Sequence, residues 1–134
     1  MFKISIDFLD QPPPRASYSR MTIDEIYGYL PWEANLSIIY NNQVFFSEQV
    51  AVAEFYWYMF NWFRKYLAGK KEQFIYSSVE HTEPILVFSN IQNGYWSIDS
   101  IWKQYSGAAL IEDQLLFSEI NNLMNKLTLA MEQQ

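Results

Sequence analysis

Apolar and polar side chains alternate at the start of the chain. Every second position of the segment FKISIDF, residues 2–8, is apolar, and a period of two is typical of a β-strand with one buried face. The proline run Pro12–Pro14 then predicts a loop, because proline donates no backbone hydrogen bond. Thr22 and Glu25 have the three-residue spacing of a capping box, which predicts a short helix over residues 23–30.

A β-hairpin is predicted from the segment LSIIYNNQVFF, residues 36–46. We expect a loop of three residues, Asn41–Gln43, because a two-residue loop would mix the faces of the two strands. The three-residue loop places one set of apolar side chains on a common face, formed by Leu36, Ile38, Tyr40, Val44 and Phe46.

Three further strands are predicted at residues 73–79, 85–89 and 95–103. Asn93-Gly94 is the strongest two-residue signal for a hairpin turn, and it joins the last two of these strands. Ile91 would then lie opposite Trp96. The resulting inner face consists of Ile85, Val87, Ile91, Trp96, Ile98 and Trp102. The other face carries Asn90, Gln92, Tyr95, Ser97 and Asp99 near the turn, with Leu86, Phe88 and Ile101 further away.

A helical period predicts two longer helices. The first covers residues 50–68, ends at Gly69 and contains the aromatic run FYWYMFNWFRKY of residues 55–66. Glycine readily adopts the left-handed conformation that ends a helix. The second covers residues 113–131, because its apolar residues recur at spacings of four and three. They are Leu116, Ile120, Leu123, Leu127 and Ala130.

These elements predict one α+β domain that spans residues 1–134. A mostly antiparallel sheet is expected to pack against one buried aromatic-rich helix and a C-terminal amphipathic helix. No internal repeat divides the chain, and 134 residues is near the commonest size of a single domain.

Composition and charge narrow the classes of partner. The chain is 50% hydrophobic and 19% aromatic, with a formal net charge of −6. Its Lys and Arg residues form no stripe of the kind that neutralises phosphates, so we expect no nucleic-acid partner. An acidic protein attracts basic partners instead. The N-terminus lacks the apolar stretch of a secretory signal peptide, and a cytoplasmic location is expected.

No catalytic or cofactor signature stands out. The chain has no cysteine, and its four glycines are too far apart for a phosphate-binding loop. Glu80, His81 and Glu83 offer three metal-binding side chains within four residues of an acidic turn, but this match is of low specificity. We therefore expect no catalysis, no cofactor and no metal.

Three roles fit the aromatic run: core, membrane contact or stacking platform. Its uncharged part is far shorter than the ~20 residues that cross a bilayer, and cations for a nucleic acid are confined to the helix end. A helical projection leaves one polar stripe, formed by Glu54, Tyr58, Asn61 and Lys65. The helix is therefore expected at the centre of the core or in a subunit contact. The expected walls of a pocket beside it are Tyr58, Trp62 and Trp96.

The predicted partner-binding residues lie in the acidic turn and on the polar side of the last hairpin. A polar zone with a tyrosine beside apolar side chains is typical of a binding surface. The set comprises Glu80, Glu83, Asn90, Gln92, Tyr95 and Asp99.

Three stretches carry a resemblance to a known class of proteins. PILVF (residues 84–88), GYWSIDSIWKQY (94–105) and the helical FYWYMFNWF (55–63) resemble segments of the small bacterial immunity proteins that neutralise polymorphic toxins. The resemblance implies binding without catalysis, with acidic groups placed against a basic toxin or enzyme.

Three hypotheses therefore follow. The first is a non-catalytic protein-binding module of the immunity type. The second is a small-molecule binder or enzyme with a pocket between the aromatic helix and the sheet. The third is a homodimeric structural module joined through exposed aromatic side chains.

Overall fold

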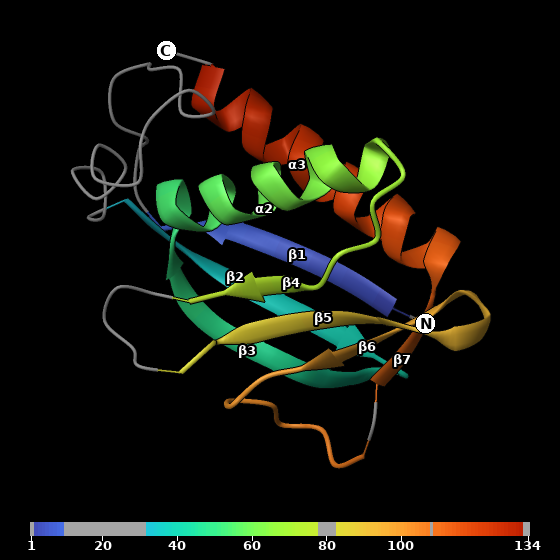
Figure 1. Cartoon of the computed structure of the whole chain (residues 1–134). Helices are drawn as coiled ribbons and strands as arrows, with labels where there is room; N and C mark the ends of the chain where they lie inside the picture. The colour runs from blue at the N-terminus through green and yellow to red at the C-terminus, as the bar shows by residue number, and fades with distance from the viewer. Residues whose placement is uncertain (1, 10–31, 78–82, 108, 133–134) are drawn as a thin grey trace.

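The computed structural model describes residues 2–9, 32–77, 83–107 and 109–132. The order of elements is β1 (Phe2–Phe8), β2 (Glu33–Tyr40), β3 (Gln43–Ala51), α2 (Val52–Leu67), β4 (Phe74–Tyr76), β5 (Leu86–Ile91), the 3-10 turn η2 (Gln92–Gly94), β6 (Tyr95–Asp99), β7 (Ala109–Glu112) and α3 (Asp113–Glu132). The α+β class is confirmed (Figure 1). The helix expected at residues 23–30 lies outside the described residues.

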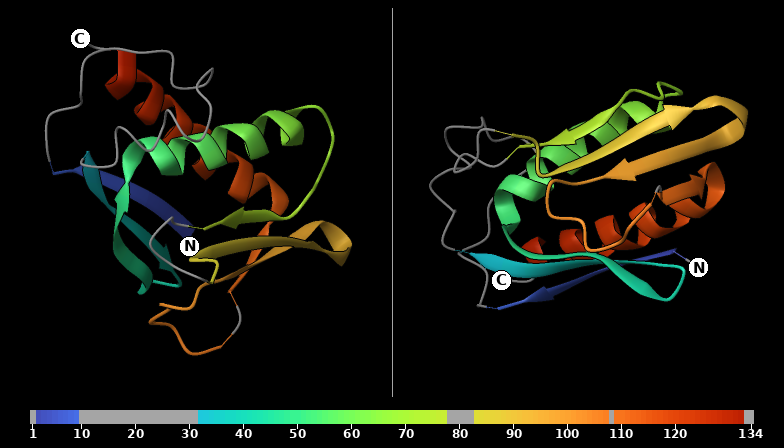
Figure 2. Two further views of the ribbon diagram at one scale, coloured as in Figure 1. Left: turned by 60° about the vertical axis from the view of Figure 1, so that its left-hand side comes forward. Right: turned by 90° about the horizontal axis from the view of Figure 1, so that it is seen from below.

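The strands form two antiparallel sheets, of order β1-β2-β3 and β4-β5-β6-β7. Helix α2 contacts β3, β4 and α3, while α3 contacts β1, β6 and β7. Both helices therefore bridge the two sheets, and they lie above them in Figure 1. In the view from below the two sheets are separate, and α3 is visible beyond them in the gap (Figure 2, right).

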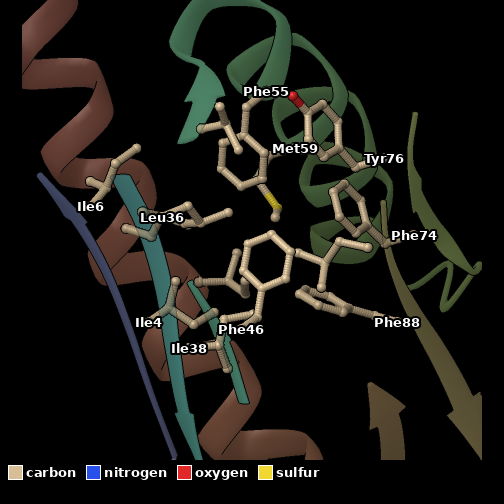
Figure 3. Close-up of a cluster of buried hydrophobic side chains, with 14 of the residues drawn as sticks. Ile4, Ile6, Leu36, Ile38, Phe46, Phe55, Met59, Phe74, Tyr76 and Phe88 are labelled. Atoms are coloured by element: carbon tan, nitrogen blue, oxygen red, sulfur yellow. The ribbon is translucent and has the colours of Figure 1, made fainter. Parts of the chain in front are cut away.

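The core fills the space between the sheets and α2 (Figure 3). Helix α2 supplies Phe55 and Met59, which are 1% and 0% exposed. Each fully buried side chain of this size stabilises the fold by about 1.5–3 kcal/mol. The aromatic helix is thus part of the core. Around it lie Ile4, Ile6, Leu36, Ile38 and Phe46 from one sheet and Phe74, Tyr76 and Phe88 from the other.

The end of α2 follows the sequence signal closely. Gly69 has a φ of +89°, and its N–H donates to the carbonyl of Tyr66 at 3.0 Å. The N–H of Lys70 donates to the carbonyl of Lys65 at 2.9 Å. This pair of bonds is the Schellman motif, which satisfies carbonyls at the helix end.

The prediction of a polar stripe on α2 is wrong for its first residue. Glu54 is 0% exposed, and its Oε1 accepts a hydrogen bond of 3.1 Å from the hydroxyl of Tyr76. Strand β4 brings this hydroxyl against the first turn of the helix. The other end of the stripe, at Lys65, is exposed.

The first hairpin has a two-residue turn, so the expected three-residue loop is wrong. Asn41 and Asn42 have φ values of 51° and 63°, which asparagine tolerates and which match the twist of a tight hairpin. A β-bulge between Ile38 and Ile39 restores the register, because Ile38 then pairs with Phe46. Both Phe45 and Phe46 are buried, whereas Val44 is 41% exposed and leaves the expected common face.

The second hairpin turns through three residues, Gln92–Gly94, and the expected two-residue turn is wrong. Ile91 pairs with Tyr95 instead of Trp96. Asn93 and Gly94 both have positive φ values, 66° and 75°, which these two residue types adopt more readily than others.

The additional turn residue exchanges the two faces of β5. Leu86 and Phe88 are buried, contrary to expectation, while Val87 and Ile91 lie on the outside. Phe88 now pairs with Ile98, so large apolar side chains of both strands share one face. A sheet register that buries all of them is favoured over one that mixes the faces.

Strand β7 is absent from the expectations, and β6 is shorter than expected. Strand β6 ends at Asp99 rather than at Lys103, and β7 pairs with it through Ile98 and Ala109. Only four residues form β7, too few for a clear period in the sequence. The expected strand at 73–79 is reduced to Phe74–Tyr76 within the described residues.

Side chains cap the exposed edges of two strands. The N–H of Ile4 in β1 donates to Oε1 of Glu119 at 2.9 Å, and the carbonyl of Ile6 accepts from Nζ of Lys126. At β7, the hydroxyl of Tyr40 lies 3.3 Å from both the N and the O of Leu110. Such capping prevents an edge strand from pairing with another chain.

Replacing Glu119 with alanine is expected to lower the free energy of unfolding by about 1–2 kcal/mol, because the partly buried N–H of Ile4 loses its acceptor. Urea titration measures this change, and light scattering measures self-association through the freed edge. The exposed neighbour Ser118 provides the control, since Ser118→Ala should change stability by no more than about 0.5 kcal/mol. Equal midpoints for the two variants would contradict the capping role.

Candidate functional site

The sheet β4–β7 has one buried face and one uncovered face. The buried face packs against α2 and α3 through residues such as Trp96 and Ile98. The opposite side, here called the outer sheet face, remains open to solvent because no described helix covers it. Its members are Ile75, Val87, Ser89, Ile91, Tyr95, Ser97, Asp99, Leu110 and Glu112.

The outer sheet face is unusually apolar for an open surface. Ile91, Tyr95 and Leu110 are 39%, 42% and 46% exposed, and Ile75 is 42% exposed. Register places Tyr95 beside Ile91 on one side and Glu112 on the other. Ile91, Tyr95 and Leu110 therefore form one apolar group near the turn, bordered by Glu112. Ile75 and Val87 form a second group, which the row of Ser89 and Ser97 separates from the first.

The outer side of the other sheet gives an internal comparison. It exposes mainly polar side chains, and apolar Ile39 and Val44 occur only near the turn. Two of its serines, Ser37 and Ser47, approach each other at 3.3 Å between their Oγ atoms. The polar members are Lys3, Ser5, Asp7, Glu33, Asn35, Ser37, Ser47 and Gln49. A solvated sheet face normally has this polar composition.

The predicted partner-binding residues divide between several places. Tyr95 and Asp99 lie on the outer sheet face along β6. Asn90 pairs with Trp96 on the opposite side of the sheet, and Gln92 lies in the turn; both are exposed. Glu80 and His81 lie outside the described residues. The predicted set lacks Ile75, Ile91, Leu110 and Glu112, whose common face results only from the three-residue turn and from β7.

Glu83 and Asp99 meet at a shallow pocket of about 240 Å³. The pocket lies at the end of the outer sheet face remote from the turn, where Val87 pairs with Asp99. Its other lining residues are Pro84, Ser100 and Ile101. Two predicted partner-binding residues are therefore neighbours in space, although they are separated in sequence.

The three expected pocket walls beside α2 pack against other rings. The ring centroids of Trp62 and Trp96 lie 5.6 Å apart in an edge-to-face arrangement, and Tyr58 lies 5.6 Å from Tyr76. Trp96 is 0% exposed. A ligand between α2 and the sheet at this point would have to separate the two tryptophan rings.

Among the described residues, no group of three or more His, Asp or Glu side chains could hold a metal ion. Neither α2 nor α3 is long and apolar enough to span a membrane.

Comparison with protein families identifies the family of the chain. Residues 4–133 match the family described as Domain of unknown function (DUF7878). The chain belongs to this family. The match includes α2, α3 and all strands except the first residues of β1, so the outer sheet face and its pocket are parts of the DUF7878 domain. No curated protein and no solved structure matches the chain.

This DUF7878 domain also contains a polar cluster around Asp113, the first residue of α3. Its Oδ1 accepts hydrogen bonds from Nε1 of Trp96 at 2.7 Å and from the hydroxyl of Tyr66 at 3.0 Å. Its Oδ2 lies 3.4 Å from Nζ of Lys71. One carboxylate thus joins α2, β6 and α3, and the favourable helix dipole adds to its stabilisation.

The contacts of Asp113 shift two pKa values in opposite directions. Burial alone would raise the pKa of Asp113, but the hydrogen bonds from Trp96 and Tyr66 and the charge of Lys71 lower it below its ordinary value. Burial, followed by the hydrogen bond to Asp113 and its charge, raises the pKa of Tyr66 to about 12. The cluster therefore holds a carboxylate and a neutral phenol near neutral pH, an arrangement suited to joining elements rather than to proton transfer.

Proposed function

We propose that this DUF7878 domain is a non-catalytic module that binds a basic protein through its outer sheet face. The observation that supports this most directly is the contrast between the two sheets. The outer side of β1–β3 is mainly polar, whereas that of β4–β7 exposes Ile75, Ile91, Tyr95 and Leu110. Exposed apolar side chains gathered on one sheet face are characteristic of interaction sites.

The composition of the outer sheet face fits a protein interface. Tyr95 combines a large apolar ring with a polar hydroxyl, and tyrosine is enriched in interface centres. Glu83, Asp99 and Glu112 are exposed carboxylates around the apolar area. Together with the net charge of −6, they favour a basic partner and predict association that weakens as salt increases.

The capped edges favour binding through a face rather than by strand addition. A partner that adds a strand needs free backbone N–H and carbonyl groups. At β1 the N–H of Ile4 and the carbonyl of Ile6 are bonded to Glu119 and Lys126, and at β7 the backbone of Leu110 is bonded to Tyr40. These contacts hinder strand addition at the two edges.

The more specific form of the proposal is an immunity-type role in the cytoplasm, in which the partner is a basic toxin or enzyme. The product of the adjacent gene is then the first candidate partner. Mixing the two purified proteins should abolish the partner's activity, and cell fractionation should recover the domain with cytoplasmic proteins. Unchanged activity of that product at saturating domain concentration would argue against this role for that pair.

Replacing Tyr95 with lysine is expected to weaken partner binding by at least about 10-fold, because the substitution removes an aromatic anchor and adds a charge that repels a basic partner. The test is capture from a lysate of the source cell at low and high salt, followed by titration of the purified partner. Val44→Lys introduces the same charge at a position of similar exposure, 41%, on the other sheet.

Three outcomes decide the proposal. Retention of the partner by Val44→Lys and its loss by Tyr95→Lys supports binding through the outer sheet face. Equal binding by both variants would move the interface elsewhere. Absence of any partner at either salt concentration overturns the binding function, and light scattering of the same samples reveals whether a second copy of the chain occupies this face.

A further inference from the structure

The pocket at the end of the outer sheet face has the size of a single side chain. Its volume is about 240 Å³, below the roughly 300–1,000 Å³ of typical small-molecule sites. It is lined by the segment that leads into β5 and by the chain that leaves β6, so it lies at the opposite end of β6 from Tyr95.

The lining combines apolar walls with two carboxylates. Pro84, Val87 and Ile101 supply the apolar part, while Glu83 and Asp99 supply the charge. A long basic side chain is complementary to both, since its methylene stem packs on apolar surface while its charged end remains at the rim. Arginine fits best because its guanidinium donates several hydrogen bonds to carboxylates in a fixed planar geometry.

The local backbone holds Asp99 in place. Its Oδ1 accepts the N–H of Ser100 at 2.9 Å. The Oγ of Ser100 in turn accepts the N–H of Trp102 at 3.0 Å, and Ser100 is only 7% exposed. The carboxylate therefore projects from an ordered turn, which reduces the entropy lost when a ligand binds.

An internal cation already pairs with one carboxylate of this pocket. The Nζ of Lys103 lies 3.2 Å from Oδ1 of Asp99, and the two side chains are 41% and 67% exposed. An exposed pair of this kind contributes little to stability and exchanges readily. No cation of the described residues pairs with Glu83, so the site retains a free carboxylate beside the occupied one.

We propose that this pocket binds an arginine side chain of a basic protein partner, and that Lys103 competes with this arginine for Asp99. The claim that this arginine belongs to a protein rests on the proposed function. The pocket would supply specificity for one basic residue, while the rest of the outer sheet face supplies apolar contact. Substitution of Lys103 then strengthens the binding of the arginine, although it removes the ion pair between Lys103 and Asp99.

The test uses N-acetyl-arginine amide as the probe and nuclear magnetic resonance of the labelled domain as the readout. With wild type we expect shifts of the backbone amides of Val87 and of residues 99–101, with a dissociation constant in the millimolar range. Lys103→Gln should lower that constant by about 2–5-fold, because it removes the competing cation. Glu83→Gln combined with Asp99→Asn should abolish the shifts, while the asparagine retains an acceptor for the N–H of Ser100.

N-acetyl-norleucine amide provides the uncharged control. Equal shifts with norleucine and arginine would overturn recognition of the cation, and the absence of shifts in both wild type and Lys103→Gln would overturn the pocket itself. An unchanged dissociation constant in Lys103→Gln would overturn the competition. Loss of arginine binding with partner capture intact refutes only this inference, whereas arginine binding without any captured partner refutes the proposed function.

Discussion

Replacing Trp96 with alanine is expected to lower the free energy of unfolding by about 3–5 kcal/mol, the range for a large aromatic residue deleted from a core. The side chain is 0% exposed, and its ring lies 5.6 Å from that of Trp62 and 6.1 Å from that of Tyr66. Its Nε1 also donates to Asp113. The substitution therefore creates a cavity and removes a polar contact together. Urea unfolding followed by circular dichroism measures the loss.

The neighbouring position on the same strand provides the matched control. Tyr95 faces outward and is 42% exposed, so Tyr95→Ala should change stability by no more than about 0.5 kcal/mol. Trp96→Phe should lie between the two, because it keeps a ring but loses the donor to Asp113. Similar unfolding midpoints for Trp96→Ala and Tyr95→Ala would mean that the assigned faces of β6 are incorrect.

Replacing Asp113 with alanine is expected to cost about 1–3 kcal/mol at neutral pH, since Nε1 of Trp96 and the hydroxyl of Tyr66 lose their common acceptor. The pKa of Asp113 is lowered from its ordinary value of 3.8. Its contribution is therefore present above about that pH and is lost as the pH falls through the lowered value in the folded protein. The difference between wild type and Asp113→Ala should decrease over this acidic range, as measured by urea unfolding at several pH values.

At alkaline pH, the titration of Tyr66 reports on the same cluster. Its pKa is raised from 10.0 to about 12, so its contribution is present below the ordinary value and is lost as the pH rises through about 12. In Asp113→Ala the phenol should titrate at lower pH, which tyrosinate absorbance detects. Glu112→Ala is the control, because this exposed neighbour has the same charge. Identical pH profiles for the two variants would contradict the cluster.

Local patterns in the sequence predicted the elements that have a clear period. The alternation of residues 2–8, the capping glycine Gly69 and the four-and-three spacing of residues 113–131 all correspond to observed structure. Their signals are strong because neighbouring residues in the chain determine them. The aromatic helix was also predicted to lie in the core, since its apolar side chains cover most of its circumference.

The register of the hairpins was decided by tertiary packing. In the first, a bulge at Phe45 corrected the faces that a two-residue turn would have mixed. In the second, an added turn residue placed Phe88 opposite Ile98. The first hairpin keeps the simple two-residue turn and buries its large side chains through the bulge, whereas the second lengthens its turn. In both cases the burial of large side chains determines the register, because a shift of one residue would expose an entire strand face.

The candidate surface shows the same division between sequence and structure. The sequence by itself determined an acidic, aromatic α+β chain and marked Tyr95, Asp99 and Glu83 as residues of interest. Only the tertiary structure placed Ile91 and Leu110 near Tyr95, Ile75 beside Val87, and Glu83 and Asp99 at one pocket. Their neighbourhood depends on sheet order, turn length and register, which local periodicity does not encode.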